Sequence, residues 1–249
     1  MARQKGIIKI EGKIGDISFY KTQDGHLARE KGGVSGERIA SDPAFVRTRE
    51  NGAEFGSSAA AGKTLRSALF SMLNTAADNR VVSRLTKVMT DIKNLDATSA
   101  RGLRNVGVAI ALPAAKLLLK GFNFNNRAIL GSVLYNPFTV NTGTGVITIN
   151  GLVPIDEIAA PPGATHVTFK GAWARINFAT GAIQIFNSNV VNLPINAVSS
   201  NVVLTPTGTP AGAGTDIYLL QIEFFQMVNL VQYSLKNGAH NSLAIVEVA

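Results

Sequence analysis

The order in which three kinds of pattern follow one another most constrains the fold of this chain. Residues 6–31 alternate apolar and polar positions between turn signals, and residues 43–121 repeat apolar positions every three or four residues. Residues 122–249 return to short β-type runs. A parallel α/β fold would need strands and helices to be interleaved. We therefore expect an α+β protein with an N-terminal β-meander, a central α-helical section and a C-terminal antiparallel β-sandwich, Ig-like or jelly-roll-like.

Composition and charge change at nearly the same place. The 249 residues are 46% hydrophobic and 16% charged, which indicates a folded chain. Residues 1–127 hold 21 Lys and Arg against 11 Asp and Glu, a balance of +10, whereas residues 128–249 hold 3 against 5, a balance of −2. We expect two domains: a basic meander-plus-helical domain over residues 1–121 and a β-sandwich over residues 122–249.

The predicted meander is organised by turn signals at Glu11-Gly12 and Asp24-Gly25. Two or three short strands are marginally stable alone, so they need another sheet or a partner to pack on. The nearly uncharged β half has few charges to block pairing at its strand edges. The partner is either the chain's own β half or a neighbouring copy joined by strand addition, and we expect the neighbouring copy. The candidate assembly residues are Ile8, Ile10, Ile17, Phe19 and Tyr20.

Helical periodicity fills the middle of the chain. Ser41 or Asp42 followed by Pro43 predicts a helix start, because proline tolerates the first helical turn. A third helix is expected over residues 99–111, with Pro113 ending or kinking it. The apolar positions of the two preceding helices are Leu65, Leu69, Met72, Leu73 and Ala76, and then Val81, Leu85, Val88, Met89 and Ile92.

The stretch EFGSSAAAGKTLRS (residues 54–67) resembles a phosphate-binding loop but departs from it. Such a loop has four residues between its glycines, whereas Gly56 and Gly62 enclose five. The residues before it are polar and charged, unlike the buried strand that the motif requires. We interpret the stretch as the interior of a helix whose small residues allow close packing.

No other motif indicates catalysis, a cofactor or a metal. The chain has no cysteine, and His26, His166 and His240 have no metal-ligand spacing. The β half has only 5 carboxylates, few for acid–base chemistry. We expect no enzyme, although a Ser-His-Asp arrangement assembled from distant residues stays open. No apolar run has signal-peptide or membrane-spanning length, so we expect a soluble, leaderless chain, cytoplasmic or particle-associated.

Basic residues are the stronger functional signal. Positions 80, 84 and 87 share one face of a predicted helix, and four more cations lie on the first predicted strands. These side chains could contact a polyanion or an acidic partner, or form an ordinary solvated surface. The candidate contacts are Arg3, Lys5, Lys9, Lys13, Arg47, Arg49, Arg80, Arg84 and Lys87.

Three segments resemble one family of proteins. They are GKIGDISFYKTQDGHLAREKGG, DPAFVRTRENGAEFG and, near the end, VQYSLKNGAHNSLAIVEV, where Asn237-Gly238 indicates a final hairpin. Together they resemble a family of uncharacterised Bacteroidota proteins that are sometimes phage-associated. The resemblance extends over the whole chain and implies a small module that assembles or decorates, with no activity attached.

These observations favour a structural subunit of a filament, tube or phage-like particle that associates with itself through edge strands and apolar helix faces. Its expected partners are copies of itself, with the basic half facing nucleic acid or an acidic protein. Two alternatives remain: a non-specific nucleic-acid-binding protein, and an adhesive or carbohydrate-binding β-sandwich module.

Overall fold

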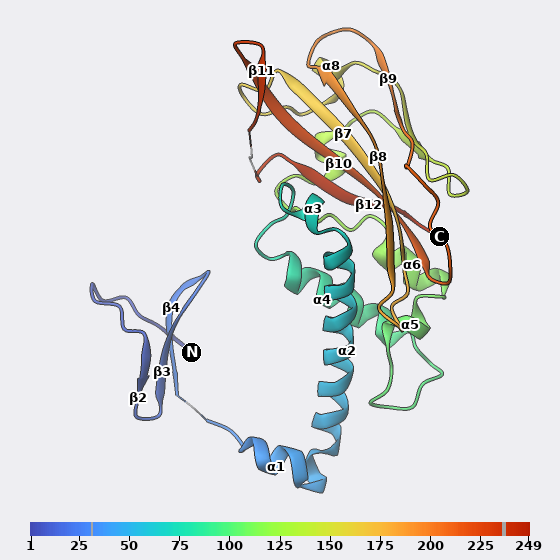
Figure 1. Ribbon diagram of the computed structural model, residues 1–249. Helices are drawn as coiled ribbons and strands as arrows, with labels where there is room; N and C mark the ends of the chain where they lie inside the picture. The colour runs from blue at the N-terminus through green and yellow to red at the C-terminus, as the bar shows by residue number, and fades with distance from the viewer. Residues whose placement is uncertain (31, 236–237) are drawn as a thin grey trace. The chain divides into compact units, whose positions relative to one another are not determined.

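The computed structural model describes residues 1–30, 32–235 and 238–249 (Figure 1). The chain is a mixed α+β protein with antiparallel sheets and a helical middle, as predicted. It divides into two compact units, residues 1–49 and 50–249, and the division falls inside helix α2 (Val46–Ala68). The change of composition at residue 121 therefore lies within the second unit.

The N-terminal unit contains a four-stranded antiparallel sheet of order β1-β4-β3-β2. The predicted hairpin at Asp24-Gly25 is confirmed: Thr22 pairs with Gly25, whose φ of 111° suits glycine. The elements are β1 (Ala2–Arg3), β2 (Gly12–Ile14), β3 (Ile17–Thr22), β4 (Gly25–Glu30), α1 (Gly36–Ser41) and the 3-10 turn η1 (Pro43–Phe45).

The prediction that Ile8 and Ile10 lie in a strand is wrong. The Gln4 side chain accepts a hydrogen bond from the Ile10 amide and donates one to the Ile10 carbonyl, so the segment forms a loop. The predicted turn at Glu11-Gly12 is also wrong. Gly12 pairs with Phe19 inside the sheet, and the chain turns three residues later.

The predicted start of the central helices is confirmed. The Asp42 carboxylate accepts a hydrogen bond from the Ala44 amide at 2.9 Å, and Pro43 lies in the first turn. Gly56 and Gly62 both lie inside α2, so the stretch is helix interior, as interpreted. Gly62 faces Leu85 and Met89, where small size permits close packing.

The helices of the second unit follow the predicted periodicity until residue 95. The expected helix over residues 99–111 is present only at residues 106–109, because the Asp96 carboxylate accepts hydrogen bonds from the amides of Ser99 and Asn105 and holds residues 99–105 as a loop. Pro113 begins a helix rather than ending one. The helices are α3 (Phe70–Leu73), α4 (Val81–Asn94), α5 (Val106–Ala109), α6 (Pro113–Leu119), α7 (Leu130–Val133) and α8 (Pro154–Glu157).

The C-terminal strands form two antiparallel sheets. One has the order β11-β10-β7-β8 with β12 also paired to β10, and the other has the order β5-β6-β9. The strands are β5 (Phe138–Val140), β6 (Ile147–Leu152), β7 (His166–Ile176), β8 (Ile183–Pro194), β9 (Ser200–Leu204), β10 (Thr215–Val228), β11 (Val231–Ser234) and β12 (Ser242–Val248).

The larger sheet is the middle of three layers in the second unit. Alternate residues of β10 point to opposite faces. Ile217 and Leu219 join the core formed with the helices, whereas Tyr218 and Leu220 join the core shared with the smaller sheet. The β-sandwich is thus confirmed, and the helical section covers its other face within the same unit.

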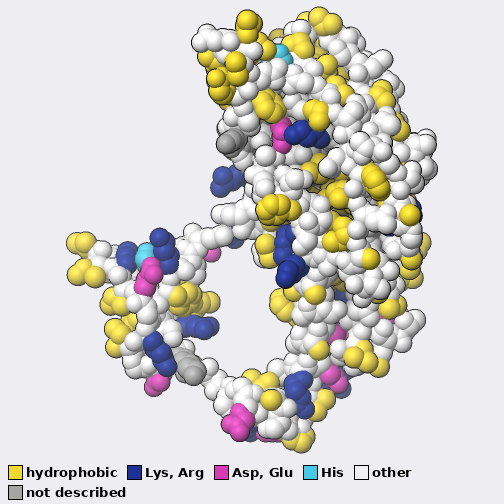
Figure 2. Space-filling model, in the orientation of Figure 1, with side chains coloured by type: hydrophobic (Ala, Val, Ile, Leu, Met, Phe, Trp, Pro, Cys, Tyr) yellow, Lys and Arg dark blue, Asp and Glu magenta, His cyan; other side chains and the backbone are white. Residues whose placement is uncertain are grey.

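Other segments of the same chain form backbone hydrogen bonds with several strands of the sandwich. Residues 121–124 bond along β12, and residues 205–207 bond to β8. The β10–β11 hairpin is more exposed: its turn residues Asn229 and Leu230 have positive φ, and Leu230 is 91% exposed. Figure 2 shows hydrophobic side chains gathered at this tip. Asn237 of the predicted final hairpin lies outside the described residues.

Candidate functional site

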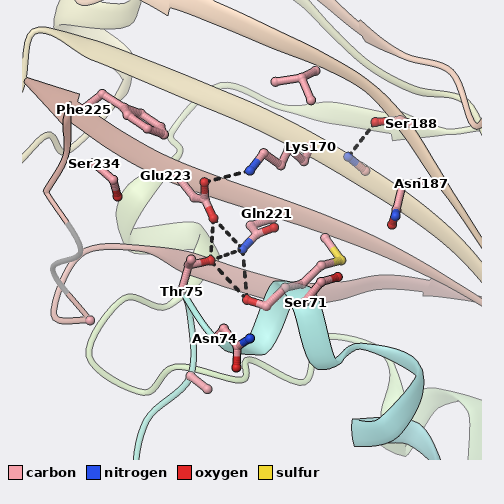
Figure 3. A pocket seen from close by; sticks show the side chains of 15 residues that line it. Ser71, Asn74, Thr75, Lys170, Asn187, Ser188, Gln221, Glu223, Phe225 and Ser234 are labelled. Atoms are coloured by element: carbon pink, nitrogen blue, oxygen red, sulfur yellow. Dashed lines mark hydrogen bonds and ion pairs between the residues drawn. The ribbon is translucent and has the colours of Figure 1, made fainter. Parts of the chain in front are cut away.

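A cleft of about 700 Å³ opens between helix α3 and the helix-facing side of the larger sheet. Its floor is a polar cluster on β7 and β10 (Figure 3). The Lys170 ammonium donates to the Glu223 carboxylate at 2.9 Å, and the Gln221 amide donates to the same carboxylate at 3.0 Å. Thr75 donates a short hydrogen bond to Glu223 from the helical side. Glu223 therefore has three partners although its side chain is nearly buried.

The cluster also joins the sheet to α3 and to the loop after it. Gln221 donates to the Met72 carbonyl at 3.1 Å and to the Thr75 hydroxyl at 2.8 Å. Asn241 donates to the Thr75 carbonyl at 3.0 Å. Because these groups satisfy one another, the floor of the cleft is held in one arrangement.

The rim of the cleft carries polar side chains of a different kind. Ser71 and Asn74 lie on the α3 side and Asn187 on β8, all three exposed. No hydrogen bond to another described residue involves these three side chains. Phe225 and Val190 add apolar surface. The rim thus offers unused donors and acceptors above a fixed floor.

The sequence contained an overlooked signal for this site. Gln221 and Glu223 stand two residues apart inside the apolar run of β10, so they point to one face of a buried strand. Buried polar groups require partners, which indicates a built polar cluster.

The N-terminal sheet has one apolar face. Cross-strand pairing places Ile14 opposite Ile17 and Phe19 opposite Ala28 on the same side. Of the described residues in this unit, none is buried, and Figure 2 shows hydrophobic side chains at its surface. Ile17, Phe19 and Tyr20 lie in β3, whose two edges are already paired within the sheet. Strand addition through β3 is therefore excluded; its side chains, not its backbone, are available.

The opposite face of this sheet is basic. Lys13 and Arg29 both lie beside Ser18, and Arg3 pairs with Leu27 in the neighbouring row. The Arg29 guanidinium lies 5.7 Å from the centre of the Tyr20 ring. The structure thus brings Arg3 and Lys13 together with Arg29, which sequence analysis did not select.

Two other predicted contact residues donate hydrogen bonds to nearby backbone carbonyls. Lys9 donates to the carbonyls of Gln4 and Gly6, and Arg49 to those of Ile39 and Asp42. Lys5 and Arg47 are exposed.

The three predicted contacts near α4 differ among themselves. Arg84 donates to the Asp78 carboxylate and to the carbonyls of Asn123 and Phe124, so it secures the following chain rather than facing solvent. Arg80 and Lys87 are exposed.

A buried ionic network centres on Glu54, whose side chain is 2% exposed. Lys93 approaches its carboxylate at 2.6 Å and Arg104 at 2.8 Å, and the Gly102 amide donates at 2.8 Å. The Arg104 hydrogen bonds, opposed by burial and joined by Lys93, lower the pKa of Glu54 to about 2. The network is complete within the protein, so we assign it to stability.

Across residues 1–30, 32–235 and 238–249, no group of three or more His, Cys, Asp or Glu side chains could hold a metal ion. None of the helices in those ranges combines the length and apolar character needed to cross a bilayer.

Comparison with known proteins adds no assignment. No protein-family model matches the chain, and no similar curated protein or solved structure was found.

Proposed function

We propose that the protein is a structural subunit that associates with copies of itself, as a component of a filament, tube or phage-like particle, and that it is not an enzyme. The observation that carries the proposal is the N-terminal sheet, which presents an apolar face with no buried residue among those described. A sheet normally buries one face against another layer. A second copy of the same face would supply that layer.

Charge supports a second copy as the occupant. On the apolar face, Glu30 lies in the row of Ile17, at one end of β3, and Lys21 lies two residues beyond Phe19, at the other end. A twofold axis that lies between two such faces and runs across the strands would set Glu30 of one copy near Lys21 of the next. Such self-complementarity is what an isologous interface requires.

Electron microscopy and mass measurement on the full chain test this proposal. We expect dimers or larger regular assemblies at micromolar concentration. A monodisperse monomer at high concentration would overturn the proposal, because the sheet would then be covered within one chain or left uncovered.

The basic face of the N-terminal sheet favours a second candidate function, non-specific binding of nucleic acid. Three cations near an aromatic ring suit contacts with phosphates and a base. We expect binding to a DNA duplex with a log–log salt slope of about −3, about −0.9 for each of three neutralised phosphates. Replacing Arg3, Lys13 and Arg29 by Ala should remove most of that slope. Replacing Arg47, Lys63 and Lys87 by Ala is the matched control, and an equal loss there would contradict assignment to this face.

A further inference from the structure

We propose that the cleft between α3 and the larger sheet binds a neutral saccharide. Its volume of about 700 Å³ falls within the range of about 300–1,000 Å³ typical of small-molecule sites. The cleft lies wholly in the second unit, so this inference does not depend on self-association.

Charge argues against an anionic or cationic ligand. The ionisable side chains among the described lining residues are Lys170 and Glu223, which neutralise each other at 2.9 Å. A phosphate or carboxylate would have to share the Lys170 ammonium with the nearly buried Glu223 carboxylate, which would repel it. A neutral ligand avoids this repulsion.

The rim groups suit hydroxyl groups in particular. The amides of Asn74 and Asn187 each offer two donors and an acceptor, and the Ser71 hydroxyl can do both. A saccharide carries many hydroxyls that also donate and accept, so it can pair with all three side chains. The apolar C–H surface of a sugar ring can pack on Phe225 and Val190.

The same lining favours binding over cleavage. Glycoside hydrolysis commonly uses two carboxylates placed on either side of the scissile bond. Glu223 is the single carboxylate among the described lining residues, and it is occupied by Lys170, Gln221 and Thr75. The cleft therefore has the groups to hold a sugar without the pair that would hydrolyse it.

Calorimetric titration of the full chain tests the inference. The probes are glucose, galactose, mannose, N-acetylglucosamine and their neutral disaccharides, with inorganic phosphate for comparison. We expect one site per chain for at least one saccharide. Its affinity should change less than about twofold between low and high salt, because no net charge is neutralised.

Variants assign the binding to the cleft. Asn74→Ala and Asn187→Ala should each weaken saccharide binding about tenfold, as loss of a good hydrogen bond does. Asn94→Ala, at the exposed end of α4, is the matched control and should bind as the parent does. Equal melting temperatures would show that all three variants fold. No binding to any saccharide, unchanged binding in both cleft variants, or tighter binding of phosphate would overturn the inference.

Discussion

Replacing both Ile14 and Ile17 by Lys is expected to convert the assembled protein into monomers. The two side chains are cross-strand neighbours on the apolar face of the N-terminal sheet and are 60% and 43% exposed. This row would then hold two ammonium groups against the single carboxylate of Glu30, and burying the uncompensated charge would oppose docking of a second copy. Mass measurement in solution, at matched protein concentration, gives the result.

A matched control and a charge exchange make this test specific. Val82→Lys alters an exposed aliphatic residue of α4, 51% exposed, and should leave assembly unchanged. Lys21→Glu and Glu30→Lys should each weaken assembly, and the double variant should recover it if the two residues meet across the twofold axis. Assembly that survives the Ile14 and Ile17 changes would exclude this face.

Replacing Glu54 by Ala is expected to lower the free energy of unfolding by about 3–5 kcal/mol, the usual cost of breaking a buried ion pair. Lys93, 7% exposed, would stay in the interior without its carboxylate. Glu50→Ala, four residues earlier, is the control. Glu50 pairs with Arg101 at 3.3 Å near the surface, so its loss should cost less than about 1 kcal/mol. Equal effects in denaturant unfolding would contradict the assigned role.

The same network predicts a pH dependence. The pKa of Glu54 falls from an ordinary 4.5 to about 2 on folding, so the unfolded chain binds the proton more tightly. The stabilisation is fully present above pH 4.5 and is lost as the pH falls from about 4.5 to about 2. Glu54→Gln should remove this component of the acid dependence. If the free energy of unfolding of Glu54→Gln kept the same dependence on acid pH, this contribution of Glu54 would be contradicted.

Helix α4 shows what local sequence patterns could predict. Val81, Leu85, Met89 and Ile92 recur at helical spacing and are all buried, as expected. Glu54 was harder to judge, because a carboxylate among the polar and charged residues of α2 resembles a solvated charge. Its spacing to Ser58 and Leu65 nevertheless places it on the buried face of α2. The signal was present, but its partners Lys93 and Arg104 are far away in the sequence.

The conformation of the loops and turns could not be predicted from local sequence patterns. The segment after Asp96 has helical periodicity, yet its amides bond to a carboxylate, an outcome that depends on exact geometry. The β10–β11 turn uses Asn229 and Leu230 at positive φ, where Asn-Gly would have been the recognisable cue. Pairing in the long β10 strand holds that turn in place.

Periodicity and turn residues along the chain determined the class of protein: a meander, a helical middle and a sandwich. They could do so because alternation and helical spacing are local properties. Tertiary structure alone decided that β1 pairs with β4, that the helices share a core with the larger sheet, and that Lys170, Thr75 and Glu223 meet in one cleft. These facts depend on contacts between residues far apart in sequence, which no local pattern encodes.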